Sequence, residues 1–281
     1  MTTPRPHTVD AGGFTTRYWE STPPHTPRGT IVLVHDGAFG GDAISSWATV
    51  MPLLARRHRV LAPDMLGYGD TDKAVYLDRS PYASRTAHLA AFCTAIGVHT
   101  AHFVGQSFGG SLLLRALAAT TPTLPALSAV SICGTGGPWR TTKGITELGH
   151  FDGTEQDMRR LVTTMVDDHP GLDDTIRTRY ANTRKPGHVT ALLAARLRHP
   201  TMSTPTTDDT WPSPLRHSPV PVLVVEGTRD DLLQPGWSRH FDNLAPHIHI
   251  HRMDTRHAPN LDQPDTLAEL LLTFLTTRTT P

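Results

Sequence analysis

Short runs of apolar residues recur along the chain, and segments with helical spacing separate them. The run at 31–34 is as long as a strand and apolar throughout, which is typical of a strand buried on both faces of a sheet. Because parallel strands need crossover connections, this alternation predicts an α/β protein with a doubly wound, mostly parallel sheet of about eight strands. The predicted strands cover residues 7–12, 15–21, 31–34, 58–64, 100–105, 127–134, 221–228 and 247–254. The predicted helices in the same regions cover 46–57, 86–97, 111–120 and 266–277.

One long interval, residues 137–218, breaks this alternation. It contains no clear strand pattern, but the stretches 155–168 and 189–199 have helical spacing. A structureless loop of this length is improbable in a compact domain. The sequence therefore predicts a core formed by 1–136 and 219–281, with 137–218 inserted as a helical cap over one end of the sheet.

The balance of acidic and basic residues limits the classes of partner that the protein is expected to bind. The chain has 281 residues, with 26 Lys and Arg against 26 Asp and Glu, so it has no basic excess of the kind that binds nucleic acid. No window approaches the roughly 18 consecutive apolar residues of a membrane span. The first residues form no apolar signal-peptide core. We therefore expect a cytoplasmic protein with a small-molecule substrate as its partner.

The cysteines and histidines give no metal-binding pattern. Cys93 and Cys133 lie far apart and are predicted to be buried thiols. The 17 histidines show no H-E-x-x-H spacing, and the HIHIH stretch at 247–251 alternates as a strand does. We expect neither a metal nor an organic cofactor.

The stretch GQSFGG at 105–110 lies where a predicted strand passes into a predicted helix. A serine at such a turn has strained backbone torsions and an exposed hydroxyl, provided that the residues two positions away are small. Gly105 and Gly109 meet that requirement. Ser107 is therefore predicted to be a nucleophile, and the backbone N–H of Phe108 is predicted to be one oxyanion donor. The alternative is an ordinary glycine-rich loop in which Ser107 caps the helix.

The glycine-rich loop HDGAFGG at 35–41 follows the first parallel strand. It can bring a second backbone N–H towards the serine, with Gly37 preferred and Ala38 as the alternative. His35 is expected to hydrogen-bond within the loop rather than transfer protons. Phe39 is predicted to line the substrate pocket, and Ala38 and Gln106 are predicted to contact the substrate with it.

Two later loops supply the remaining groups of a nucleophile–base–acid arrangement. Asp230 and Asp231 follow one predicted strand, and Asp230 is preferred as the carboxylate that orients an imidazole. His257 follows the last strand and is predicted to be the general base. The chain order Ser, Asp, His is the one that this architecture uses. Both aspartates could instead cap a turn.

Five stretches of the sequence resemble successive signatures of the α/β-hydrolase superfamily. They are IVLVHDGAFGG, HRVLAPDMLGYGDTD, FVGQSFGG, VVEGTRDDLLQP and RHAPNLDQPD. The resemblance covers nearly the whole chain outside 137–218, where members carry a variable cap. It implies the α/β-hydrolase fold with Ser107, Asp230 and His257 as catalytic triad and with Gly37 and Phe108 in the oxyanion hole.

The sequence also departs from that pattern. Many members have Gly where this chain has Asp36, and an acidic side chain that pointed into the oxyanion hole would oppose the negative charge formed there. The loop and the stretch SWATVMPLL resemble the meta-cleavage-product hydrolases, which break C–C bonds in vinylogous diketo acids. Those enzymes usually carry Asn before the nucleophile and Trp after the histidine, where this chain has Gln106 and Ala258.

The sequence therefore predicts a serine hydrolase that cleaves a small, largely apolar ester or lactone through an acyl-enzyme. C–C bond hydrolysis of a diketo-type substrate is the first alternative, and thioester hydrolysis follows it. A cofactor-independent oxygenase and a ligand receptor on the same fold remain further alternatives. Haloalkane dehalogenases and epoxide hydrolases of this fold use an Asp nucleophile, so Ser107 argues against both.

Overall fold

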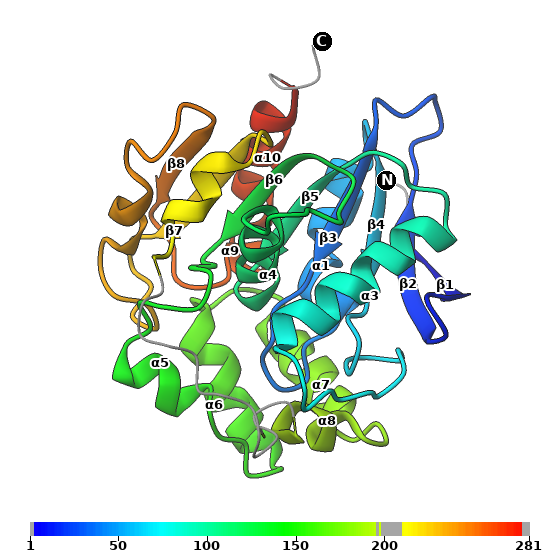
Figure 1. Cartoon of the computed structure of the whole chain (residues 1–281). Helices are drawn as coiled ribbons and strands as arrows, with labels where there is room; N and C mark the ends of the chain where they lie inside the picture. Colours follow the sequence, from blue (N-terminus) through cyan, green and yellow to red (C-terminus); the bar gives the residue numbers. More distant parts are fainter. Residues whose placement is uncertain (1–2, 195–196, 198–209, 277–281) are drawn as a thin grey trace.

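The computed structural model describes residues 3–194, 197 and 210–276, and its centre is one eight-stranded sheet (Figure 1). The strand order is β1-β2-β4-β3-β5-β6-β7-β8. The strands are β1 (Arg5–Asp10), β2 (Thr15–Ser21), β3 (Thr30–Val34), β4 (Arg59–Pro63), β5 (Ala101–Gln106), β6 (Ala126–Ile132), β7 (Val222–Gly227) and β8 (Ile248–Met253). β2 pairs antiparallel with β1 and β4, and all other pairs are parallel. The predicted sheet is confirmed, and each predicted strand overlaps an observed one.

The central strand β3 is apolar from Ile31 to Val34 because helices cover both faces of the sheet. Along β3, Ile31 and Leu33 belong to one buried cluster, whereas Val32 and Val34 belong to another. Successive side chains of a strand point to opposite faces, so a strand buried on both sides needs apolar residues at every position. This is why the run at 31–34 shows no alternation of polar and apolar residues.

Helices flank the sheet on both sides (Figure 1). They are α1 (Ala43–Trp47), α2 (Val50–Leu54), α3 (Pro81–Ala95), α4 (Phe108–Leu117), α9 (Pro259–Asp262) and α10 (Pro264–Thr276), and a 3₁₀ helix, η2, covers Trp237–Phe241. The single helix predicted for 46–57 is wrong, because two short helices, α1 and α2, occupy this region. Pro52 has no N–H to donate to a carbonyl four residues earlier, and the structure places it in the first turn of a new helix.

The interval between β6 and β7 contains α5 (Thr142–Glu147), α6 (Glu155–Met165), α7 (Leu172–Thr183), α8 (His188–Ala194) and the 3₁₀ helix η1 (Ser213–His217). The predicted helix at 155–168 is present as α6. The predicted helix at 189–199 is present as α8 up to Ala194, and most of its remainder lies outside the described residues. The sequence missed α7, because its residues are mostly polar and few of them are buried. We refer to the segment 137–218 as the cap, and its status as a separate domain stays a prediction.

The cap lies at the carboxyl ends of the parallel strands (Figure 1). The N–H of Thr141 donates to the carbonyl of Leu232 after β7, at 3.0 Å, and the N–H of Ala258 after β8 donates to the carbonyl of Met165, at 3.1 Å. Ligands of open α/β sheets bind at this edge. The cap therefore covers the edge where the candidate reactive residues emerge.

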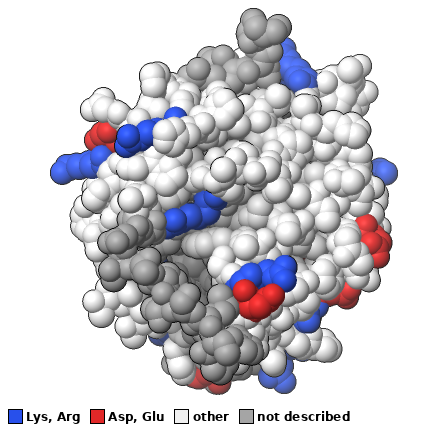
Figure 2. Space-filling view, viewed as in Figure 1, with Lys and Arg blue, Asp and Glu red and all other residues white. Residues whose placement is uncertain are grey.

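The described helices and the charged surface bear on membrane and nucleic-acid binding. No helix within residues 3–194, 197 and 210–276 combines the length and the apolar character needed to cross a membrane. On the face drawn in Figure 2, the Lys and Arg side chains are scattered among uncharged residues and lie close to acidic ones in several places. The cytoplasmic location stays a prediction.

Candidate active site

Ser107 lies on a sharp turn between β5 and α4. Its backbone has φ 54° and ψ −113°, a conformation that residues other than glycine rarely adopt. A side chain at Gly105 would overlap the backbone of Gly109, and one at Gly109 would overlap the carbonyl of Val34. The two glycines therefore permit the close strand–helix approach that the sequence predicted, and the strained turn presents the Ser107 hydroxyl above the sheet edge.

The structure brings Ser107, His257 and Asp230 into one hydrogen-bonded line. The His257 Nε2 lies 2.8 Å from the Ser107 Oγ, and the His257 Nδ1 lies 2.7 Å from the Asp230 Oδ2. Because an ionised carboxylate only accepts hydrogen bonds, Nδ1 carries the proton and Nε2 is left as an acceptor for the serine hydroxyl. This tautomer is the one in which an imidazole can take the proton of an attacking serine.

The two candidate aspartates have different environments. The Oδ1 of Asp230 accepts the N–H of Leu232 at 3.0 Å, so both carboxylate oxygens have donors, and the side chain is buried. Asp231 points away from His257, pairs with Lys143 and has a side chain that is 44% exposed. The geometry therefore brings Asp230, the preferred candidate, to the imidazole.

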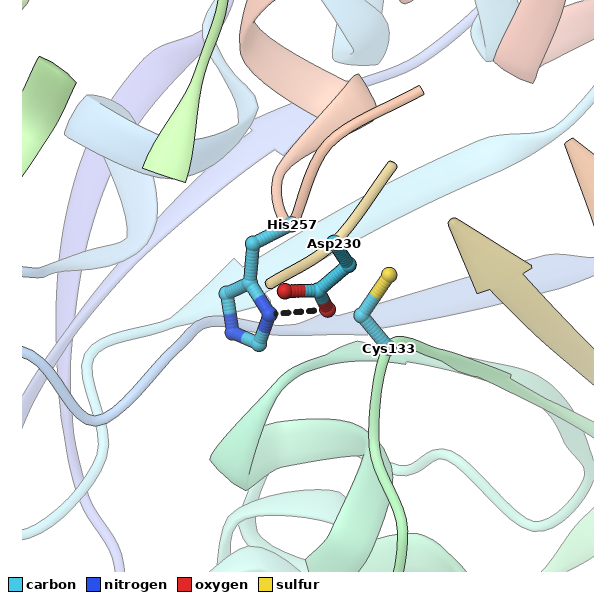
Figure 3. A group of neighbouring side chains, drawn as sticks. All are labelled: Cys133, Asp230 and His257. Carbon is cyan, nitrogen blue, oxygen red and sulfur yellow. Dashed lines mark hydrogen bonds and ion pairs between the residues drawn. The ribbon is translucent and has the colours of Figure 1, made fainter. Parts of the chain in front are cut away.

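Cys133, at the end of β6, lies on the other side of Asp230. In Figure 3 the Asp230 carboxylate lies between the imidazole of His257 and the thiol of Cys133. The three potential ligand atoms lie within 4.8 Å of one another, and all three residues are buried. However, the His257–Asp230 hydrogen bond already occupies two of these atoms, and burial raises the pKa of the Cys133 thiol well above its usual value. The cluster is explained by contacts within the protein and gives no reason to expect a metal ion.

The backbone around His257 is held from two sides. The side-chain amide of Gln106 donates from Nε2 to the His257 carbonyl at 2.9 Å, and Gln106 is fully buried. The next residue, Ala258, donates its N–H to the cap at Met165. Gln106 was predicted to contact the substrate, but it is absent from the cavity wall. Its position instead indicates that it holds the loop that carries His257.

The geometry distinguishes the two candidate oxyanion donors of the glycine-rich loop. The N–H of Ala38 donates to the Asp36 Oδ1 at 2.9 Å, whereas no hydrogen bond within the described part of the chain takes up the N–H of Gly37. A Cβ on Gly37 would lie 2.8 Å from the Cβ of Phe108, so the two predicted donors are on adjacent backbone segments. Gly37 and Phe108 are thus the better-placed pair. Within the described part of the chain, His35 hydrogen-bonds to the backbone of Asp36 in the loop, as expected, and also to the backbone of Met65 outside it.

A cavity of about 210 Å³ opens above Ser107 and His257. Gly37, Ala38 and Phe108 contribute to its wall beside the serine. The apolar part of the wall consists of Leu148, Met165, Leu232 and Leu233, and the polar part of Tyr82, Ser111, Thr135 and Arg140. The reactive groups therefore face a cavity that can hold a small molecule.

The sequence of the chain matches the alpha/beta hydrolase family over residues 31–270. The chain belongs to this family. The match includes every strand of the parallel part of the sheet, the cap and the three residues of the hydrogen-bonded line. It confirms the resemblance and the α/β-hydrolase fold that the sequence motifs predicted.

Several characterised proteins are similar to this alpha/beta hydrolase along nearly its whole length. A 2-hydroxy-6-oxo-6-(2'-aminophenyl)hexa-2,4-dienoic acid hydrolase from Metapseudomonas resinovorans is 28% identical over 292 residues, which cover 96% of this chain and 90% of the relative. A meta-cleavage product hydrolase from Pseudomonas fluorescens IP01 superposes with a TM-score of 0.81 at 22% identity, covering 96% and 97% of the two chains. A carboxylesterase from Bacillus subtilis superposes with a TM-score of 0.75 at 19% identity, covering 98% and 92%. The relatives support an enzymatic, hydrolytic function, and the solved structures show the shared fold.

Asp36, the acidic residue in the loop of this alpha/beta hydrolase, does not point into the oxyanion hole. Its two carboxylate oxygens accept hydrogen bonds from Arg179 of α7, at 3.1 Å from Nη1 and 2.6 Å from Nη2. Both side chains are almost fully buried, with exposures of 2% and 1%. Burial alone would raise the pKa of Asp36, but the charge and hydrogen bonds of Arg179 outweigh it and hold the pKa well below its usual range. The expected conflict with an oxyanion is therefore relieved by a buried cation.

Part of the cavity wall was not predicted from the sequence, and a second residue besides Gln106 was misplaced. Phe39 does not line the cavity; it is buried and packs against Phe151 of the cap, with ring centroids 5.5 Å apart. Tyr82 was not predicted, although it stacks on Phe108 at 4.9 Å. Arg140 was also missed; its position soon after a predicted strand was the available signal.

Proposed function

We propose that this alpha/beta hydrolase is a serine hydrolase that works through an acyl-enzyme. The observation that carries the proposal is the line from Ser107 through His257 to Asp230, with hydrogen bonds of 2.8 and 2.7 Å beside a cavity. An isolated serine hydroxyl is a weak nucleophile at neutral pH, and an adjacent imidazole of the correct tautomer activates it. Here the Ser107 Oγ lies beside the His257 Nε2, and the His257 Nδ1 lies beside the Asp230 carboxylate, which supports this mode of activation.

In the proposed mechanism, Ser107 attacks a substrate carbonyl while His257 takes its proton. The negative charge on the carbonyl oxygen is stabilised by the N–H groups of Gly37 and Phe108. His257 then gives the proton to the leaving group, and the bond between the carbonyl carbon and that group breaks. Water, activated by the same imidazole, hydrolyses the acyl-serine and releases an acid. These steps require only side chains and backbone groups of the chain.

The first substrate class that we propose is a diketo-type acid in which a C–C bond beside a ketone is cleaved. Four relatives that each match more than two thirds of the chain carry names of this type, including a 2-hydroxymuconate semialdehyde hydrolase that matches 72% of it, whereas a fifth is a bifunctional epoxide hydrolase. Among the described residues that line the cavity, Arg140 is the single Lys or Arg, and none of them is an Asp or Glu. A guanidinium at the wall favours a substrate that carries a carboxylate. The leaving carbon would take up the proton that His257 holds.

The second substrate class is the small apolar ester or lactone that the sequence analysis placed first. Gln106 and Ala258 stand where the resemblance to C–C hydrolases would require Asn and Trp. The apolar wall formed by Leu148, Met165, Leu232 and Leu233 also suits an uncharged substrate. Both substrate classes use the same acyl-enzyme chemistry. They differ in the leaving group and not in the catalytic residues that they require.

The proposal is tested first with a small fluorophosphonate and intact-mass measurement. We expect one adduct on the wild type and none on Ser107→Ala, since only an activated serine reacts. A folded wild type that gains no adduct even with the smallest reagent would contradict the proposal and favour the oxygenase or receptor alternatives, which leave Ser107 chemically idle.

A substrate panel then separates the two classes. It contains a 2-hydroxy-6-oxo-hexa-2,4-dienoate, whose cleavage is followed by loss of its absorbance, alongside a p-nitrophenyl ester and a lactone. A kcat/KM for the dienoate above those of the other two supports C–C hydrolysis. The reverse order assigns the protein to the esterases. Ser107→Ala serves as the control for each substrate.

A further inference from the structure

The buried pair of Asp36 and Arg179 joins the cap directly to the loop that carries the oxyanion donor Gly37. The two residues are 143 positions apart in the chain. Most other ion pairs of the described residues involve side chains that are at least partly exposed, whereas both partners here are at most 2% exposed. A two-point contact between a planar guanidinium and a carboxylate fixes orientation as well as distance. The pair therefore determines how the cap and the loop are placed relative to each other.

On the loop side, Asp36 fixes the peptide groups next to Gly37. Its Oδ1 accepts the N–H of Ala38 at 2.9 Å, and its Oδ2 accepts the hydroxyl of Ser46 at 3.0 Å. The carbonyl of Gly37 itself accepts the hydroxyl of Tyr68 at 3.1 Å. The peptide that follows Gly37 is thus held at both its carbonyl and its N–H. The Gly37 N–H belongs to the preceding peptide, whose carbonyl, that of Asp36, lies 2.7 Å from the His35 Nδ1. With the peptides on both sides of Gly37 held, its N–H has a fixed direction and no competing acceptor in the described part of the chain.

On the cap side, Arg179 belongs to a group of residues that hold the same loop. Asn182, one turn further along α7, donates from Nδ2 to the carbonyl of Gly40 at 3.0 Å. His188 of α8 accepts the N–H of Gly40 at its Nε2, also at 3.0 Å. These two contacts hold the far end of the loop, whereas Arg179 is the member of this group of three that contacts the carboxylate beside Gly37.

The charge of Arg179 has a second consequence. The Asp36 carboxylate is adjacent in sequence to Gly37, where negative charge develops on the substrate oxygen in the proposed mechanism. An uncompensated buried carboxylate at that distance would oppose this charge, because interactions between charges are strong where water is excluded. Arg179 cancels the charge of Asp36 and keeps the donor environment electrically neutral.

We propose that Asp36 and Arg179 are positioning residues for the oxyanion hole, through which the cap fixes the Gly37 N–H in its catalytic direction. The inference rests on the proposed function, because it concerns the same acyl-transfer step. Neither residue lines the cavity, so neither is expected to contact the substrate. Their removal should lower the rate of the chemical step and leave substrate binding largely unchanged.

The experiment compares Arg179→Gln, Asp36→Asn and the double variant with the wild type, using the fluorophosphonate rate constant and the kcat and KM of the best panel substrate. Loss of a single oxyanion donor typically costs about 10²–10³ in kcat, and we expect at least a tenfold fall in each single variant with KM within about threefold. The double variant replaces the ion pair with two amides and should regain much of the lost rate. Arg177→Gln, an exposed arginine of the same helix, is the matched control and should behave as the wild type.

The pH dependence of the rate distinguishes a positioning role from a purely structural contact, because a purely structural contact would not change it. Among the described residues, His35 is the other titratable group that acts on Asp36, and Asp42 acts on both His35 and Arg179. In Arg179→Gln, burial should therefore raise the pKa of Asp36 above its value in the wild type. The rate of this variant relative to the wild type should therefore rise as the pH falls, and the relative rate of the double variant should stay flat. Parallel profiles for all variants would overturn the inference.

The outcomes separate the inference from the function on which it rests. An unreactive wild type means that the proposed function fails. A reactive wild type whose folded single variants keep their kcat within twofold means that the positioning role alone is wrong. If Arg179→Gln does not fold, Ser46→Ala removes one donor to Asp36 while keeping the ion pair, and we expect a smaller fall, about threefold, in kcat. An unchanged kcat in that variant would then contradict the inference.

Discussion

Two buried carboxylates lie beside the candidate active site, and they differ in the partner that each one has. Asp230 faces a neutral imidazole and a backbone N–H, whereas Asp36 faces a guanidinium that is always charged. The partner of Asp230 can gain and lose a proton during a reaction, but the partner of Asp36 cannot. The same residue type can therefore orient a proton carrier in one place and hold two parts of the chain together in another.

Among the substitutions that test this difference between the two carboxylates, Asp230→Asn should have the largest effect, and that effect is on activity. In Asp230→Asn, the amide oxygen stays with the N–H of Leu232, so the amide NH2 group faces His257 Nδ1 and can only donate to it. The imidazole therefore changes to the tautomer that cannot accept the serine proton. We expect kcat to fall by about 10³–10⁴-fold. Asp231→Asn is the matched control, and its kcat should remain within twofold of the wild type. Similar losses in the two variants would contradict the assignment of Asp230.

The next largest expected effect is a loss of folding stability when Asp36 is replaced. In Asp36→Asn, the buried guanidinium of Arg179 loses its counter-charge, and breaking a buried pair in this way costs about 3–5 kcal/mol. Asp230→Asn keeps an oxygen for the N–H of Leu232 and leaves no buried charge, so we expect its free energy of unfolding to change by less than about 1 kcal/mol. Urea unfolding of both variants measures the contrast. An equal loss of stability would show that the two carboxylates do not differ in this way.

The smallest effect concerns a buried histidine that has no carboxylate partner. The Nδ1 of His102 lies 2.8 Å from the Ser128 Oγ, and burial lowers the pKa of His102 to about 4. Between pH 7 and 5.5 the unfolded chain therefore takes up a proton at this residue and the folded chain does not, so stability falls as the pH falls. His102 accounts for about 1 kcal/mol of that loss.

The pH effect is measured by urea unfolding at both pH values. His102→Gln should lose less stability than the wild type over this range by that amount. His25→Gln, at an exposed position, should lose as much as the wild type. Equal losses in the wild type and His102→Gln would show that the folded protein takes up the proton as readily as the unfolded chain.

The sequence allowed the sheet and the hydrogen-bonded line to be predicted for one shared reason. Each of Ser107, Asp230 and His257 follows a strand, and parallel strands bring their carboxyl ends to one edge, so the order of elements alone implies proximity. The helix boundaries were less accurate. The division between α1 and α2 depends on Pro52, and the start of α3 depends on Ser80 as N-cap and Pro81 in the first turn.

The contacts made by the cap could not be predicted in the same way. The sequence raised Asp36 as a possible conflict with the oxyanion hole, but nothing local to it indicates a partner in α7. That helix is itself mostly polar, so its apolar spacing was too weak to locate it. Phe39 was misplaced for a related reason, because its ring packs on Phe151 of the cap, a contact that depends on how two distant segments dock.

The contact between the cap and the glycine-rich loop has a consequence for the engineering and divergence of such enzymes. Caps are exchanged or redesigned to change the choice of substrate, on the assumption that the core keeps its reactivity. Here a graft that brings in a new cap without an arginine equivalent to Arg179 would leave Asp36 as an unmatched charge inside the core. Chimeras should therefore retain activity only when the loop at 35–41 and the cap are transplanted as one unit.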